Sequence, residues 1–164
     1  MQQLIESVLG GGGEMGERMR AFDWSTTTLG PLDRWPQSLR ISVRIMLDSG
    51  YPMAICWGRD YTLLYNDAER SMFGTKHPGA LGRSIRDVWP EAWESTGPIY
   101  ERVMTQSQAY TTLTDQLFPL NRNNYLEECY FVLSFSPIPD DEGHVGGVFV
   151  TGMDTTERVI GPQP

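Results

Sequence analysis

The hydrophobic pattern changes its period after Gly50, and this change limits the possible folds more than any other feature of the chain. Residues 36–48 repeat apolar side chains at the spacing of an α-helix. Beyond the glycine, Tyr51–Trp57 and Tyr61–Tyr65 have the composition of strands, and the three residues between them suit a short hairpin connection. The sequence therefore predicts a helix that leads directly into a β-hairpin.

The predicted helix at 36–48 carries two apolar stripes. The larger stripe consists of Leu39, Val43, Met46 and Leu47. We expect it to cover the core, because apolar residues three and four positions apart share one helix face. Ile41 and Ile45 form a second stripe. This second stripe predicts either contact with another copy of the chain, giving a homodimer, or packing under the segment around Phe22 and Trp24.

Short helices and three further strands are expected beyond the hairpin. The helices are predicted at Asp67–Phe73, Ala80–Val88 and Glu91–Gln106. The strands are predicted at Ala109–Leu117, Leu126–Ile138 and Val145–Met153. Strands on both sides of a helical insert indicate a five-stranded antiparallel sheet with short helices on one face, which is an α+β domain.

Composition and charge narrow the function classes. With 164 residues and a hydrophobic share of 40%, the chain fits one domain with a flanking segment. Its net charge of −8 opposes binding to phosphate backbones and anionic lipids, so we expect no nucleic-acid partner and no direct membrane contact. Cys56 and Cys129 are expected to be reduced core thiols, and no signal-peptide pattern is present, which together favour a cytoplasmic protein.

Four regions are expected along the chain. Residues 1–13 end in a run of glycines and are predicted to be a flexible segment. Residues 14–50 form a helical lead-in, residues 51–158 form the folded domain, and residues 159–164 begin a linker.

Three stretches of the chain resemble a PAS domain. They are MAICWGRDYTLLYNDA in the first hairpin, LGRSIRDVWPE before the longest helix, and YFVLSFSPIPDDEGHVGGVFVTGMDTTER in the last hairpin. The preceding FDWSTTTLGPLDRWPQSLR resembles the helical lead-in ahead of PAS domains in bacterial multidomain sensor proteins, which are often histidine kinases. The resemblance extends over about Tyr51 to Arg158. It implies a sensory module with an internal pocket, attached to an effector domain in the parent chain.

Bulky apolar residues are the candidates for the lining of the implied pocket. They are Trp57, Tyr65, Phe73, Trp89 and Tyr100, with either Phe131, Leu133 and Phe135 or Tyr130, Val132 and Ser134 from the strand after Leu126. The period of two along a strand does not decide between these two sets. Such a lining would enclose a small apolar or aromatic ligand, although aromatic residues at strand spacing also serve as ordinary core.

The sequence argues against flavin, haem and metal cofactors. By resemblance, flavin photosensors of the LOV type carry a cysteine in the helical insert, and the corresponding HPGALGRSIRDVWPEAW has none. Haem-binding relatives place a histidine on the longest helix, whereas Glu91–Gln106 contains none. The two histidines and two cysteines of the chain are too dispersed to form a metal-binding motif.

Three polar residues are candidates for signal relay. By resemblance, Asn66 ends the second strand and turns the chain into the helices, although an ordinary Asx turn explains it equally well. Asp154 and Thr156 match the Asp-x-Thr ending of the last PAS strand. Asp154 is predicted to cap an outgoing helix, with Glu157 as its capping-box partner.

Two functions remain open from the sequence. The first is a sensor that binds a small molecule in its pocket and relays the state to an effector. The second is a ligand-free PAS module for dimerisation and signal relay, whose own side chains fill the pocket. No arrangement of nucleophile, histidine and carboxylate indicates catalysis, so any kinase or other enzymatic output is expected outside this segment.

Overall fold

The computed structural model describes residues 1–112 and 115–162, within which six strands form one antiparallel sheet. The strands are β1 (Met53–Trp57), β2 (Thr62–Tyr65), β3 (Tyr110–Thr111), β4 (Gln116–Asn121), β5 (Leu126–Pro139) and β6 (Val145–Asp154). Their order is β2-β1-β6-β5-β3, and β4 also pairs with β5. The predicted α+β class and antiparallel sheet are confirmed. The strand predicted at Ala109–Leu117 is instead two short strands, and residues 113–114 between them lie outside the described part of the chain.

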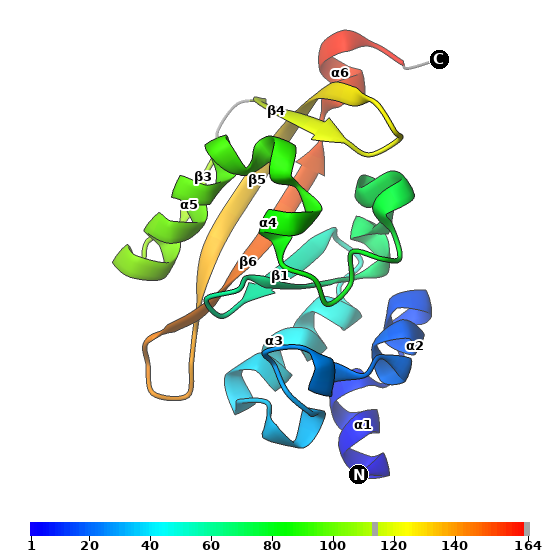
Figure 1. Cartoon of the computed structure of the whole chain (residues 1–164), viewed down its shortest axis with the longest axis vertical. Coiled ribbons are helices and arrows are strands. Elements are labelled where there is room, and N and C mark those ends of the chain that lie inside the picture. Colours follow the sequence, from blue (N-terminus) through cyan, green and yellow to red (C-terminus); the bar gives the residue numbers. More distant parts are fainter. Residues whose placement is uncertain (113–114, 163–164) are drawn as a thin grey trace.

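A helical insert between β2 and β3 crosses one face of the sheet (Figure 1). It consists of η3 (Asp67–Lys76), α4 (Ile85–Val88), η4 (Pro90–Ala92) and α5 (Trp93–Gln106). The helix predicted at Ala80–Val88 begins only at Ile85. The reason is that Gly82 donates a backbone hydrogen bond to Leu63 of β2 and Arg83 accepts one from it, so this stretch pairs with the strand.

The N-terminal region forms three helices, α1 (Gln2–Leu9), α2 (Gly13–Ala21) and α3 (Gln37–Asp48), with 3₁₀ turns η1 (Trp24–Thr26) and η2 (Leu32–Arg34). The prediction of a flexible segment over 1–13 is wrong for α1. Val8 and Leu9 of this helix are buried, and the Arg44 and Arg20 side chains donate hydrogen bonds to their carbonyl oxygens at 3.2 and 2.6 Å. Burial of an apolar stripe, rather than intrinsic propensity, holds such a short helix in place.

The predicted larger stripe of α3 is buried, as the sequence indicated. Helix α3 contacts β1, β2 and β5. Ile41 and Ile45 are 52% and 51% exposed, so the alternative in which they pack under the segment around Phe22 and Trp24 is wrong. Instead, the indole of Trp24 packs between Phe22 and Trp35.

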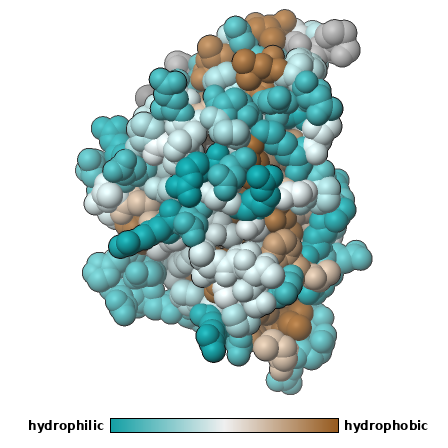
Figure 2. All heavy atoms as spheres, viewed as in Figure 1, coloured by the Kyte–Doolittle hydropathy of each residue, from teal (hydrophilic) through white to brown (hydrophobic). Residues whose placement is uncertain are grey.

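The two termini lie at opposite ends of the molecule, and a last short helix, α6 (Thr156–Ile160), follows β6 (Figure 1). In the view of Figure 2, hydrophilic side chains cover much of the surface. Apolar groups gather at the end of the molecule that carries α6. Among the described residues, none of the helices has both the length and the apolar character needed to cross a lipid bilayer.

Candidate functional site

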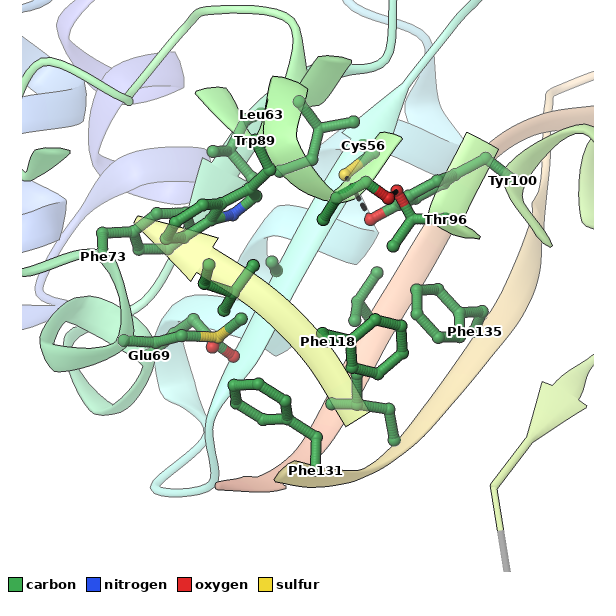
Figure 3. A pocket seen from close by; sticks show the side chains of 17 residues that line it. Cys56, Leu63, Glu69, Phe73, Trp89, Thr96, Tyr100, Phe118, Phe131 and Phe135 are labelled. Carbon is green, nitrogen blue, oxygen red and sulfur yellow. Dashed lines mark hydrogen bonds between the residues drawn. The ribbon is translucent and has the colours of Figure 1, made fainter. Parts of the chain in front are cut away.

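A cavity lies between the inner face of the sheet and the helical insert (Figure 3). Its aromatic lining consists of Phe73, Trp89, Tyr100, Phe118, Phe131 and Phe135, and its polar lining includes Cys56, Glu69 and Thr96. The free volume is about 50 Å³. That is room for roughly three to five water molecules, so only a ligand with few non-hydrogen atoms fits this arrangement of side chains.

The pairing of β5 decides which of its faces lines the cavity. Phe131, Leu133 and Phe135 are buried and point into it, whereas the alternative set Tyr130, Val132 and Ser134 points to the other side of the sheet. Antiparallel pairing places Leu133 opposite Gly152 and Phe135 opposite Val150 of β6. Residues directly opposite one another share a face, so Val150 also lines the cavity.

Two of the predicted lining residues lie outside the cavity. Trp57 points to the opposite face of the sheet, because Cys56 next to it faces the cavity and successive strand residues alternate. Its indole instead covers Gly146 and Gly147, where any Cβ would lie within 3 Å of the ring. Tyr65 lies behind Phe73, with ring centroids 4.3 Å apart, and its hydroxyl is 2.7 Å from Nδ1 of His77.

The remaining predicted lining residues, Phe73, Trp89 and Tyr100, come together at the cavity from the helical insert. Phe73 and Trp89 are stacked, with ring centroids 5.6 Å apart. The Lys76 ammonium lies 4.2 Å from the Trp89 ring centroid. The same ammonium group forms an ion pair with Glu91 at 2.6 Å. Lys76 therefore holds Glu91 and the Trp89 ring together.

The polar groups of the lining are held in their neutral forms by burial. The Cys56 thiol donates a hydrogen bond to the Tyr100 hydroxyl at 3.7 Å, and burial raises the pKa of this thiol to about 12. Burial also raises the pKa of Tyr100. Burial, with a smaller effect of the Asp154 charge, raises the pKa of Glu69 from 4.5 to about 8. At neutral pH the empty cavity is therefore lined almost entirely by uncharged groups.

Sequence reasoning missed several lining residues, and Glu69 is the most informative of them. The other missed residues are Ala54, Cys56, Leu63, Met72, Ile85, Ala92, Thr96, Phe118, Leu120 and Val150. Glu69, Met72 and Phe73 are spaced three and four residues apart, which is the spacing of one helical face. That spacing was the available signal that the carboxylate shares the face of the predicted Phe73.

Asn66 is almost completely buried, with 1% of its surface exposed, and it caps η3 directly after β2. Its Oδ1 accepts hydrogen bonds from the backbone N–H groups of Met53 and Glu69, both at 3.1 Å. Its Nδ2 donates to the carbonyl oxygens of Met46 and Tyr51 at 3.0 and 2.9 Å. One side chain thus joins α3, β1 and the start of the insert.

Asp154 occupies the end of β6, but it is not the N-cap of the following helix. Helix α6 begins at Thr156, its N-cap is Thr155, and no side-chain bond reaches back from Glu157 in the described contacts. Asp154 accepts a hydrogen bond from the Thr156 backbone N–H at 3.0 Å, and its other oxygen accepts one from Arg122 at 2.7 Å. Burial opposes ionisation, but these bonds hold the pKa of Asp154 below its ordinary value.

Thr156 ties the start of α6 to β5. Its hydroxyl accepts a hydrogen bond from the Tyr130 backbone N–H at 2.9 Å, while the Thr155 N–H donates to the Tyr130 carbonyl at 2.7 Å. The two residues after β6 thus continue its pairing with β5 into the first turn of α6.

The insert also approaches the turn between β4 and β5. Gly74 interrupts η3 with a φ of 54°, and a Cβ there would lie 2.0 Å from the Arg122 carbonyl oxygen. The Thr75 N–H donates to this same oxygen at 2.7 Å. Since Arg122 also pairs with Asp154, the wall of the cavity and the end of β6 share one contact point.

Among the described residues, the side chains that could bind a metal ion are dispersed. No group of three or more His, Cys, Asp or Glu side chains in residues 1–112 and 115–162 gathers closely enough to hold a metal ion. The cysteine that lines the cavity lies on β1 rather than in the helical insert.

An antiparallel sheet whose inner face is closed by short helices around an apolar cavity defines a class of α+β domains. The chain belongs to this class as a member of the PAS fold family, whose model matches residues 47–160. No curated protein sequence matches the chain.

Solved structures are similar to the chain in fold. An RNA-binding light-oxygen-voltage receptor is 23% identical, with a TM-score of 0.53 over 73% of this chain and 33% of the receptor. The chain thus spans about a third of that receptor's length. A PAS domain from Colwellia psychrerythraea is 13% identical, with a TM-score of 0.53 over 73% of this chain and 98% of that domain. A sensory box sensor histidine kinase from Vibrio cholerae is 16% identical, with a TM-score of 0.47 over 72% of this chain and 92% of the other.

Proposed function

We propose that this PAS domain binds a small molecule in its internal cavity and relays the occupied state to an effector attached in the parent chain. The observation that carries the proposal is the cavity itself, because its lining is apolar except for one buried acid and a few neutral polar groups. Ligand pockets in proteins combine an apolar lining with a few oriented polar groups in this way. Flavin and haem are not part of the proposal.

A route from the cavity to the C-terminal end supports the relay. Phe131 of the lining is paired directly with Asp154 across β5 and β6. Asp154 in turn binds the side chain of Arg122. The carbonyl oxygen of Arg122 accepts a hydrogen bond from the backbone N–H of Thr75 in η3. A ligand that moves η3 or Phe131 therefore displaces groups in contact with the start of α6, which leads toward the proposed effector.

Exposed apolar residues around α6 support a protein partner at this end. They are Leu117, Tyr125, Leu126, Met153, Val159 and Ile160. We propose that the parent protein is a cytoplasmic bacterial multidomain sensor of the histidine kinase type, and that residues 159–164 begin its linker. Of this stretch, residues 163–164 lie outside the described part of the chain. Any enzymatic step is assigned to the effector.

A cavity-filling variant tests the ligand-binding function. Ala54→Ile places a larger side chain in the lining, while Ala109→Ile makes the same change at an exposed position. Native mass spectrometry of protein purified from cell extract is expected to show a bound small molecule in the unmodified chain and in the Ala109 variant, and none in the Ala54 variant. If no variant carries a ligand and the Ala54 variant of the parent protein still responds to its stimulus, the ligand-binding function is wrong.

A ligand-free dimerisation module is the second candidate, and two observations favour it. The cavity is small, and Ile41 and Ile45 expose half of their surface on α3. We propose a homodimer through this α3 surface under either function. Ile41→Asp with Ile45→Asp is expected to give a monomer in light scattering. Arg102→Asp with Gln106→Asp, at exposed positions of α5 with the same spacing, is the matched control and should keep the dimeric mass, and a dimeric mass for the α3 variant would exclude this surface.

A further inference from the structure

Glu69 places a carboxyl group inside the cavity. Only 7% of the residue surface is exposed, and its carboxyl oxygens point from η3 into the cavity between the side chains of the insert and Phe131 (Figure 3). Met72 and Phe73 of the same element lie beside it in the lining. The backbone N–H of Glu69 is used by Asn66, so η3 is fixed at this residue while its side chain projects inward.

The Glu69 carboxyl group has no hydrogen-bond donor or cation in contact among the described residues 1–112 and 115–162. Other partly buried acids of the chain are paired. Glu91 accepts from Lys76 at 2.6 Å, and Glu127 accepts from Arg122 at 3.2 Å. A buried carboxyl group without a partner costs free energy that a bound donor would recover. The absent partner is therefore expected to come from the ligand.

The groups that face Glu69 favour a cation over an anion. Asp154 of β6 adds a negative charge, and the guanidinium of Arg122 is already held by Asp154 and Glu127. Cys56 of β1 and Tyr100 of α5, which face Glu69 across the cavity, are uncharged at neutral pH. No lysine or arginine is among the described residues that line the cavity, so an anion would find no cation to pair with there.

The aromatic lining suits the carbon body of such a ligand. Phe73, Trp89 and Phe131 line the cavity and offer apolar surface to a small organic group. We propose, as a deepening of the ligand-binding function above, that the cavity binds a small organic amine. Its ammonium group pairs with Glu69 and its carbon body lies against the aromatic and aliphatic lining.

A second hollow on the same wall offers the amine a route of entry. It shares Glu69, Met72 and Phe131 with the cavity, and its outer rim includes Arg122 and Asp154. The flexible Met72 side chain lies between the two spaces. An amine that enters here passes the ion pair of Asp154 with Arg122.

Isobutylamine and isobutanol provide a matched pair of probes, because they have the same carbon body and differ in charge. Isothermal titration calorimetry on the full chain is expected to show that the amine binds at least about tenfold more tightly than the alcohol. Glu69→Gln should remove this preference and leave the alcohol unchanged. Glu101→Gln, at an exposed position on α5, should bind the amine like the unmodified chain.

Proton release gives a readout that a purely structural role of Glu69 would not produce. Pairing with an ammonium ionises the carboxyl group, so amine binding near neutral pH should release up to one proton, seen as a dependence of the binding heat on the ionisation enthalpy of the buffer. The affinity for isobutylamine should also rise as the pH rises toward 8. Glu69→Gln should show neither effect.

The outcomes separate this inference from the function on which it rests. The amine proposal is wrong if isobutanol binds as tightly as isobutylamine, or if Glu69→Gln binds both probes with unchanged affinity. The cavity then remains a binding site for a neutral ligand. If isobutylamine does not bind, the amine proposal is also wrong. The ligand-binding function fails only if the Ala54→Ile experiment gives its negative result as well.

Discussion

Two buried polar residues, Asn66 and Glu69, have opposite relations to their surroundings. Asn66 is fully hydrogen-bonded to the backbone of three elements, whereas Glu69, three residues later, has no described partner for its side chain. A satisfied buried polar group specifies structure, and an unsatisfied one costs stability. At the residue scale we therefore assign architecture to Asn66 and ligand recognition to Glu69.

Asn66→Ala is expected to lower the free energy of unfolding by about 2–4 kcal/mol, because several buried backbone groups lose their partner at once. Chemical denaturation measures this change. Asn123→Ala, in the exposed turn between β4 and β5, is the control and should change stability by less than about 0.5 kcal/mol. Equal effects of the two substitutions would show that Asn66 is an ordinary turn residue.

Glu69 should make stability depend on pH. Burial raises its pKa from 4.5 to about 8, so between these values the folded chain keeps a proton that the unfolded chain has released. The contribution of Glu69 to the free energy of unfolding therefore falls as the pH rises through this range. Glu69→Gln should flatten the fall and be more stable near pH 8 by roughly 2–4 kcal/mol. Urea denaturation across the range would refute this if Glu69→Gln and Glu101→Gln gave the same profile as the unmodified chain.

At the element scale, the junction between β6 and α6 is the point where the cavity wall meets the outgoing chain. Asp154 holds the Thr156 backbone and Arg122, and Thr156 holds Tyr130 of β5. The first turn of α6 is thus bonded to both long strands. Any change in the sheet at Phe131, which is opposite Asp154, reaches this turn directly.

Asp154→Ala is expected to loosen α6 with a small loss of global stability, about 1 kcal/mol, because it removes one backbone hydrogen bond and a partly exposed ion pair. Amide hydrogen exchange should show faster exchange at Thr156 while β1 and β2 stay protected. In the parent protein the variant should bind the ligand normally and respond weakly. A wild-type response would restrict Asp154 to a structural role.

At the scale of the whole molecule, the N-terminal helices and the PAS sheet share one core. Val8, Met15 and Met19 belong to the same buried cluster as the strands. The Asp67 carboxylate of η3 accepts hydrogen bonds from the Glu14 and Met15 backbone N–H groups at 3.1 and 2.8 Å, at the start of α2. The lead-in is therefore expected to unfold together with the domain.

Leu9→Asp tests this cooperation, because it buries a charge in α1 at a residue that is 2% exposed. It should destabilise the entire chain by about 3–5 kcal/mol in a single transition. Gln3→Asp, at an exposed position on the same helix, is the control. Thermal unfolding followed by both circular dichroism and tryptophan fluorescence measures the effect. Two separate transitions would show that α1 is not part of the cooperative unit.

The sequence by itself indicated most of the elements, the α+β class and the buried stripe of α3, and its resemblance to PAS domains indicated the family. The elements, the class and the stripe follow from the period of the hydrophobic pattern and from turn residues, which act over a few positions of the chain. Phe73, Trp89 and Tyr100 were placed in the lining by the same local information combined with the family resemblance. Local patterns of this kind can be read without knowing which residues pack against them.

Only the tertiary structure decided which side of each strand faces the cavity. The sequence does not show whether Phe131 or Tyr130 faces the cavity. It also suggests Trp57 as a lining residue, whereas in the structure the neighbouring Cys56 faces inward. The choice depends on pairing between strands that are far apart in the chain, and a shift of one residue exchanges the two faces. The sequence could not show that Leu9 is buried or that the Glu69 carboxyl group lacks a described partner for the same reason. Both depend on contacts between distant parts of the chain, which local patterns do not contain.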